Sequence, residues 1–222
     1  VLLLHGCCHN PCGADLSQEQ WREVTALVAE RGLLPFIDIA YQGMGAGLDE
    51  DAYGPRYMAS ELPEVLVAVS NSKNMGLYRE RTGAMLFVGA SQDAAEIITS
   101  QGTRAARKIY SMPPAHGAIL AGMVLTDPAL TAGWRAELSG ICSRINGLRD
   151  MLAEKLSAAT SKDFDFIRRE NGMFSFLGLT PEQVQRLREE FSVYMVGSSR
   201  INVAGVNSAN VDYLAEAVAK VL

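Results

Sequence analysis

Short apolar runs that alternate with amphipathic helical stretches are the feature that most limits how this chain can fold. Such runs stand at 1–4, 34–38, 65–69 and 84–88, and the last two are apolar throughout rather than at every second residue. Continuous apolar runs of this length are typical of strands that helices cover on both faces. We therefore predict an α/β domain with a mostly parallel, buried central sheet.

The stretch that begins at Ser17 predicts the first helix. Ser17 and Gln20 fit a capping box, Trp21 opens an apolar helical face, and Gly32 supplies a stop signal. Further helical patterns are expected at 91–108 and 118–124, with an interruption at Pro113-Pro114. Helices that alternate with apolar strands are the pattern of a β-α-β arrangement.

The second half of the chain opens with one long helical pattern. From Leu130 to Leu156 the apolar residues recur at steps of three and four. Beyond this helix we expect short strands at 164–167 and 173–177, a helix capped at Thr180-Pro181, and a last helix from Val211. We predict two domains: residues 1–128 in the larger α/β domain, and residues 129–222 in a small α+β domain.

Composition excludes several classes of function. The formal net charge is −5 without a long run of Lys or Arg, which argues against nucleic acid and anionic membranes as partners. No apolar run approaches the roughly 18 residues of a membrane span. Cys7, Cys8, Cys12 and Cys142 are not spaced like a secreted disulfide framework, so we expect a cytoplasmic protein.

Lys73 stands where a reactive amine is expected, directly after the third apolar run. A lysine nucleophile must be desolvated or placed among cations so that a neutral amine is available. The end of a buried strand offers that setting. A lysine in an isolated Ser-x-x-Lys segment is more often a solvated loop residue, so this interpretation depends on the motifs around it.

Five motifs follow one another along the chain. They are His-Gly-Cys-Cys-His-Asn-Pro-Cys-Gly at 5–13, Asp-Ile-Ala-Tyr-Gln-Gly at 38–43, the segment 70–81 with Lys73, Tyr-Ser-Met-Pro-Pro-Ala-His-Gly at 110–117, and Arg-Ile-Asn-Val-Ala-Gly at 200–205. In order and spacing they resemble the class I, fold-type I aminotransferases, most closely the aspartate and aromatic amino acid aminotransferases. The resemblance runs to Leu222. It implies a homodimeric enzyme that uses pyridoxal 5′-phosphate.

The resemblance assigns the catalytic roles. Lys73 corresponds to the lysine that forms a Schiff base with the cofactor and then moves a proton at the substrate α-carbon. Asp38 corresponds to a buried carboxylate that pairs with the pyridinium nitrogen. Tyr41 and Asn10 correspond to residues that hydrogen-bond the phenolic oxygen of the cofactor.

The remaining binding roles also follow from the resemblance. Ser70, Ser72 and Arg81 correspond to phosphate ligands, and Arg200 to the arginine that binds the substrate α-carboxylate. Arg107 corresponds to the arginine that binds a distal carboxylate, with Arg104 as a nearby competitor. The implied reaction is reversible amino transfer between an amino acid and a 2-oxo acid, with aspartate or glutamate favoured and aromatic substrates as the alternative.

The chain departs from the family in two ways. Cys12 stands where the family usually has Thr. The family chain is also roughly twice as long, so the resemblance implies that 1–128 is the C-terminal part of a cofactor domain truncated at its N-terminal side. Such a chain is expected to bind cofactor weakly on its own.

Other functions remain open at this point. A related transaminase or a carbon–sulfur lyase uses the same scaffold, and a catalytically incomplete fragment could act only in assembly. A zinc site is a further alternative, because metal-ligand side chains cluster near the start of the chain at His5, Cys7, Cys8, His9 and Cys12. The spacing lacks a Cys-x-x-Cys pair, so we expect no metal.

Overall fold

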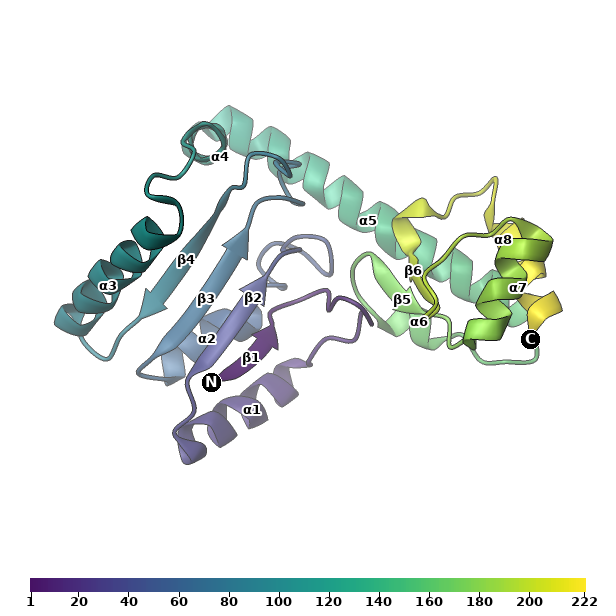
Figure 1. Ribbon diagram of the computed structural model, residues 1–222, viewed down its shortest axis with the longest axis horizontal. Helices are drawn as coiled ribbons and strands as arrows, with labels where there is room; N and C mark the ends of the chain where they lie inside the picture. Colours follow the sequence, from purple (N-terminus) through teal and green to yellow (C-terminus); the bar gives the residue numbers. More distant parts are fainter. The chain divides into compact units, whose positions relative to one another are not determined.

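The structure, a computed structural model, describes residues 1–222 as two compact units (Figure 1). The first unit consists of Val1–Cys7, Leu16–Gly43 and Gly47–Leu138; the second consists of Cys8–Asp15, Met44–Ala46 and Ser139–Leu222. The division along the long helix α5 (Pro128–Ala159) therefore falls between Leu138 and Ser139. No helix combines the length and the apolar character that a bilayer crossing requires.

The first unit is built on a four-stranded sheet in the order β1-β2-β3-β4. Its elements are β1 (Leu2–His5), α1 (Gln18–Arg31), β2 (Pro35–Ile39), α2 (Tyr53–Glu61), β3 (Val65–Ser70), β4 (Gly83–Val88), α3 (Gln92–Tyr110) and α4 (His116–Thr126). The first three strands are parallel and β4 is antiparallel to β3. This confirms the predicted α/β class with a mostly parallel sheet.

Helix α1 forms as its local signals predict. The Ser17 side chain and Gln20 close the capping box, and Gly32 adopts a left-handed backbone with φ of 60° at the other end. Trp21 of α1 packs so closely on Gly54 of α2 that a Cβ atom on Gly54 would lie 2.1 Å from the indole ring. The sequence had not predicted α2, which lacks a side-chain cap and is placed by this contact.

The prediction of a sheet covered on both faces is wrong for β4. Residues 83–86 are exposed, and Leu86 retains 50% of its accessible surface. Helix α3 follows β4 but contains no buried residue. Apolar character alone thus identified the strand, but it did not show whether this chain contains the elements that would cover it.

The second unit closes around its own core. Besides the part of α5 from Ser139 onward, it contains α6 (Phe166–Arg169), β5 (Phe174–Phe176), α7 (Pro181–Phe191), β6 (Arg200–Asn202), a 3-10 turn (Val203–Gly205) and α8 (Val211–Val221). Strands β5 and β6 are antiparallel. Leu152, Leu156, Leu187 and Val218 are completely buried in the cluster that joins α5, α7 and α8.

The strand predicted at 164–167 is wrong, because this segment turns into the short helix α6. Phe164 and Ile167 are both buried, and a spacing of three residues puts them on one side of a helical turn. Asp165 accepts hydrogen bonds from Arg168 and Arg169 at 3.0 Å each, which stabilises that turn. The strand predicted at 173–177 is present as β5.

Candidate active site

Strands β2 and β3 bring several predicted site residues to one edge of the sheet. The two strands are parallel, with Asp38 opposite Ala68 and Ile39 opposite Val69. Their carboxyl ends therefore meet at the same edge, which is where open α/β sheets bind ligands. Asp38 and Tyr41 stand at the end of β2, and Ser70, Ser72 and Lys73 stand at the end of β3.

The amine of Lys73 lies against an aromatic ring rather than far out in water. Its Nζ atom is 4.7 Å from the centroid of the Tyr41 ring, and that tyrosine is 7% exposed. An ammonium at this distance is attracted by the ring face, and the ring displaces part of its hydration shell. The structure thus brings together two of the three predicted catalytic residues.

The loop that carries Lys73 is fixed on both sides of the lysine. Ser72 is buried, and its N–H donates to the Ser70 hydroxyl at 3.2 Å. The Asn74 side-chain amide donates to the carbonyl of Gln42 at 3.3 Å, and the Asn74 carbonyl accepts a hydrogen bond from the Trp134 indole at 2.7 Å. The Gln42 contact links this loop to the segment that contains Tyr41.

Ser70 and Arg81 line one hollow beside the start of β4. The hollow has a volume of about 340 Å³ and is also lined by Val69 and the segment 82–85. A hydroxyl and a guanidinium are the donors that a phosphate group requires. Arg81 is exposed, and its guanidinium donates to the Tyr78 carbonyl at 2.9 Å.

Asp38 and Arg107 are exposed as well, like Arg81. Asp38 was expected to be buried, but the alternation of side chains along β2 buries Ile37 and Ile39 and leaves Asp38 exposed. The expectation of a buried carboxylate is therefore wrong for this chain. Arg107 lies in the last turn of α3 with an exposed side chain, as does Arg104 one turn earlier.

Asn10 and Arg200 contact each other within the second unit. The guanidinium of Arg200 donates to the side-chain oxygen of Asn10 at 3.0 Å. Its central carbon also lies 4.8 Å from the centroid of the Phe174 ring, across the β5–β6 pair. Arg200 further lines a hollow of about 540 Å³ together with Tyr194 and Tyr213. The guanidinium is therefore held in place from two sides.

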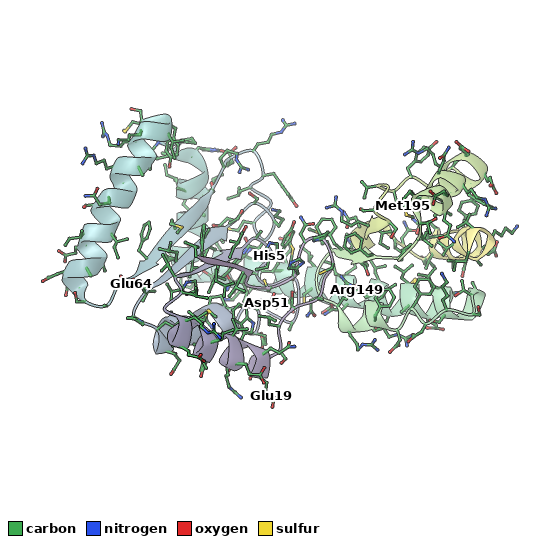
Figure 2. The ribbon with its side chains drawn as sticks, turned by 60° about the horizontal axis from the view of Figure 1, so that its bottom comes forward. His5, Glu19, Asp51, Glu64, Arg149 and Met195 are labelled. Atoms are coloured by element: carbon green, nitrogen blue, oxygen red, sulfur yellow. The ribbon has the colours of Figure 1, made fainter.

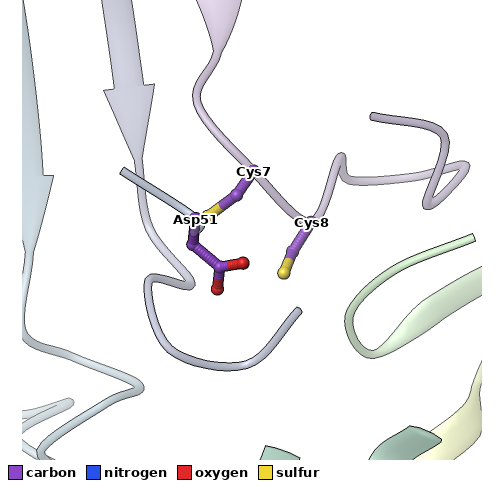
Figure 3. A group of neighbouring side chains, drawn as sticks. All are labelled: Cys7, Cys8 and Asp51. Atoms are coloured by element: carbon purple, nitrogen blue, oxygen red, sulfur yellow. The ribbon is translucent and has the colours of Figure 1, made fainter. Parts of the chain in front are cut away.

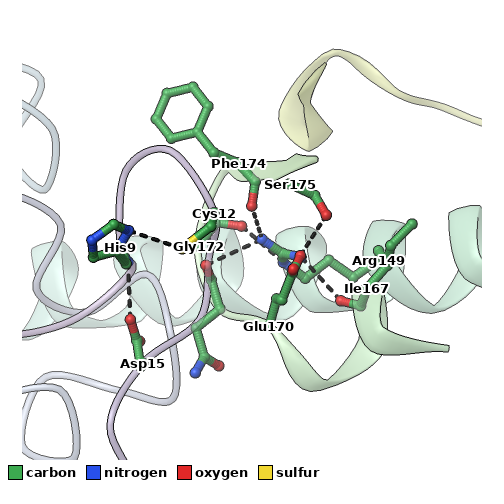
Figure 4. A network of polar contacts seen from close by, with 10 residues as sticks. His9, Cys12, Asp15, Arg149, Ile167, Glu170, Gly172, Phe174 and Ser175 are labelled. Carbon is green, nitrogen blue, oxygen red and sulfur yellow. Dashed lines mark hydrogen bonds and ion pairs between the residues drawn. The ribbon is translucent and has the colours of Figure 1, made fainter. Parts of the chain in front are cut away.

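A buried guanidinium that the sequence analysis missed organises the surroundings of this pair. Arg149 of α5 is 1% exposed (Figures 2 and 4). It donates to the carbonyls of Ile167, Asn171, Gly172 and Phe174 at 2.6–3.1 Å and to the carboxylate of Glu170 at 3.3 Å. Burial lowers the pKa of Arg149, and Glu170 opposes this shift. One signal was available, since position 149 lies four residues after Ile145 on the apolar stripe of the helix.

The loop that carries Asn10 is pressed against the same network. Gly13 adopts φ of 74°, and a Cβ atom there would lie 2.7 Å from the Phe174 carbonyl oxygen. The Gly13 carbonyl accepts the Asn171 N–H at 2.8 Å. The carboxylate of Asp15 accepts the N–H groups of Cys8 and His9 at 2.7 and 2.9 Å. These contacts fix the loop on both sides of Asn10.

The residues of the zinc alternative do not gather as a zinc site requires. His5 and Cys7 belong to the first unit, where Cys7 and Asp51 hold ligand atoms within 4.8 Å of each other (Figure 3). The Asp51 carboxylate also accepts the Gly43 N–H at 2.8 Å. Within neither unit do three of the five predicted residues bring ligand atoms together, whereas structural zinc sites use about four.

The chain can also be compared with known protein families by its sequence. A sequence profile described as "Aminotransferase class I and II" matches residues 1–218. The chain belongs to this family.

Individual relatives agree with this assignment. The chain is 51% identical to an aromatic-amino-acid aminotransferase of Paracoccus denitrificans and 48% identical to an aspartate aminotransferase of Haemophilus influenzae, in each case over 100% of this chain and 56% of the relative. A solved aromatic-amino-acid aminotransferase of Burkholderia pseudomallei, covalently bound to pyridoxal phosphate, superposes with a TM-score of 0.96 at 46% identity over 99% of this chain and 55% of that one. The chain thus spans about half the length of these relatives.

Proposed function

We propose that this chain carries the lysine and the α-carboxylate site of an enzyme that uses pyridoxal 5′-phosphate to transfer an amino group between an amino acid and a 2-oxo acid. The observation that carries the proposal is the Nζ atom of Lys73, 4.7 Å from the centroid of the buried Tyr41 ring, at the carboxyl edge of a parallel sheet. The Burkholderia relative with covalently bound pyridoxal phosphate supports the choice of cofactor.

The residues at the sheet edge fit this cofactor chemically. Pyridoxal phosphate supplies an aldehyde that combines with amines and a ring that withdraws electrons from the substrate α-carbon. Lys73 presents the amine that holds the cofactor and, when free, takes and returns the proton at the α-carbon. Tyr41, beside that amine, carries a phenolic hydroxyl that would hydrogen-bond the phenolic oxygen of the cofactor. Asp38 would provide the carboxylate for the ring nitrogen.

The phosphate and the substrate carboxylate are assigned to separate arginines. Ser70, Ser72 and Arg81 hold the phosphate, since Ser70 and Arg81 line one hollow. Arg200 offers a guanidinium fork to the α-carboxylate of the substrate, and the hydrogen bond to Asn10 orients that fork. Fixing the carboxylate would restrict the orientation of the α-carbon, and so which of its bonds can break.

The class of amino acid depends on the distal part of the substrate. Relatives with similar identity carry names for aspartate and for aromatic amino acids, so both classes remain in the proposal. Arg107 is the candidate for binding a distal carboxylate. The names of the relatives favour amino transfer over carbon–sulfur lysis. We further propose a cytoplasmic homodimer for the complete enzyme.

Covalent capture of the cofactor tests the central residue. The chain is incubated with pyridoxal phosphate, reduced with borohydride, digested and analysed by mass spectrometry. We expect the reduced adduct on Lys73 at lower cofactor concentrations than on exposed Lys108 and Lys162, which report non-specific reaction. A Lys73→Ala chain should lose the preferred adduct and keep the other two. Equal labelling of all three lysines contradicts the proposal.

A further inference from the structure

Cys12 differs from the other three cysteines in its exposure, and an imidazole lies beside its sulfur. Cys7, Cys8 and Cys142 are buried, with exposures of 4%, 2% and 7%, whereas Cys12 is only half-buried. Its sulfur lies 3.0 Å from the Nδ1 atom of His9 (Figure 4). We propose that Cys12 is an oxidation site, a thiol that reacts with hydroperoxides because His9 accepts its proton.

The geometry of the pair is set by the backbone. The His9 N–H donates to the carboxylate of Asp15 at 2.9 Å, and the His9 carbonyl accepts the Gly13 N–H at 2.7 Å. The turn from His9 to Gly13 is thus closed by its own hydrogen bond, and Cys12 is the residue just before its end. Imidazole and thiol therefore face each other without a further rearrangement of the chain.

Cys12 and Cys142 have chemically different hydrogen-bond partners. Cys142 is buried and donates to the carbonyl oxygen of Gly45 at 3.2 Å. Cys12 faces the Nδ1 atom of an imidazole, which can remove the proton in the tautomer that leaves Nδ1 unprotonated. Because the thiolate is the nucleophile, a cysteine paired with histidine reacts faster than one paired with a carbonyl.

The reaction balances with one peroxide molecule. The sulfur attacks one oxygen of the hydroperoxide, so that an S–O bond forms and the O–O bond breaks. Sulfur is oxidised from thiol to sulfenic acid, and the peroxide is reduced to water or an alcohol. The proton that leaves Cys12 passes to His9 and then to the departing oxygen, so His9 ends in the state in which it began.

Trapping of the sulfenic acid tests the proposal without any assay of amino transfer. The chain is exposed to increasing hydrogen peroxide in the presence of dimedone, and each cysteine peptide is quantified by mass spectrometry. We expect the Cys12 adduct to appear first, with Cys7, Cys8 and Cys142 unmodified. The order should disappear in urea, where all four thiols are solvated. Earlier labelling of a buried cysteine overturns the proposal.

A His9→Asn chain separates activation from simple exposure. Asparagine places a polar atom near the position of Nδ1 but cannot act as a base. We expect labelling of Cys12 to slow about tenfold or more, with hydrogen exchange of the loop 8–15 unchanged. Cys12→Ser should abolish that adduct and confirm its assignment. An unchanged rate in His9→Asn shows that exposure alone explains the reaction and overturns the role of His9.

Discussion

The two units of this chain differ in how completely they bury their apolar side chains. The second unit buries a continuous cluster that includes Leu152, Leu187 and Val218. The first unit buries Trp21 between α1 and α2, yet it leaves Leu86 of β4 half exposed and contributes nothing buried from α3. A patterned apolar sequence therefore yields a closed core only where the chain itself contains the covering elements.

The polar site residues follow the same division. Arg200 and Asn10 bond each other within the second unit, next to the enclosed guanidinium of Arg149. In the first unit, Arg81 lines an open hollow and Asp38 is exposed. The proposed carboxylate-binding pair is thus already oriented, while the proposed cofactor residues are only partly enclosed. Preorganised groups bind more tightly because less entropy is lost on binding.

Replacing Arg149 should produce the largest loss in the enclosed network. Arg149→Leu leaves four carbonyls without this donor and leaves the partly buried Glu170 carboxylate without its salt-bridge partner. We expect the second unit to lose about 3–5 kcal/mol of unfolding free energy. Hydrogen exchange of α7 and α8 measures this unit. The fluorescence of Trp21 and Trp134, both in the first unit, follows the other one.

Arg144→Leu on the exposed side of α5 is the matched control. It removes the same charge from the same helix, and its effect should stay within about 0.5 kcal/mol. Equal losses for the two variants would show that Arg149 contributes no more than a surface arginine. The contrast between an enclosed second unit and an open first unit would then no longer hold for the polar residues.

Two leucine-to-alanine substitutions, one in each unit, test whether the units differ in the burial of their apolar side chains. Leu152→Ala empties space in a fully buried position, whereas Leu86→Ala removes a side chain that is half exposed. We expect losses of about 3 kcal/mol and less than about 1 kcal/mol, respectively. Hydrogen exchange of α8 and of β3 gives the two values. A larger loss at Leu86 would show that β4 contributes to a core that the solvent exposure of its residues does not reveal.

Elements with strong local signals were predictable from the sequence. Capping boxes marked α1 and α7, and the apolar stripe of α5 predicted one long helix. Helix α2 was missed because it has no capping side chain and depends on Trp21, which is distant in sequence. Segment 164–167 was mistaken for a strand because Phe164 and Phe166 flank Asp165 in the alternation typical of a strand, whereas the buried positions, Phe164 and Ile167, are three apart as in a helical turn.

The residues of the candidate site also divide into those that local sequence signals predicted and those that depend on distant segments. The proximity of Ser70 and Arg81 was predictable from one contiguous motif, because the connection between β3 and β4 contains it; the roles of these residues and of Lys73 stay predictions. Arg149 was missed, since a buried arginine is acceptable only where carbonyls from another segment surround it. The exposure of Asp38 likewise depends on what covers β2, which its own motif does not encode.

The pH dependence of the Arg149–Glu170 pair gives the smallest and sharpest test. Burial raises the pKa of Glu170, although the hydrogen bond from Ser175 and the charge of Arg149 oppose the shift. The folded state therefore favours the protonated carboxyl. Its stabilising contribution is complete below the unfolded pKa of about 4.3 and is lost as the pH rises through the folded pKa.

Glu170→Gln cannot ionise, so the unfolding free energy of the unmutated chain should fall relative to that of the variant as the pH rises from about 4 toward neutrality. Urea unfolding of both chains, followed by circular dichroism at matched pH values, gives this difference, because the other titrating groups are common to both and cancel. A difference that grows in favour of the unmutated chain with rising pH would mean that attraction to Arg149 outweighs burial. The carboxylate would then stabilise the second unit in its ionised form. Its contribution would resemble that of a solvent-exposed ion pair in the first unit, despite its burial.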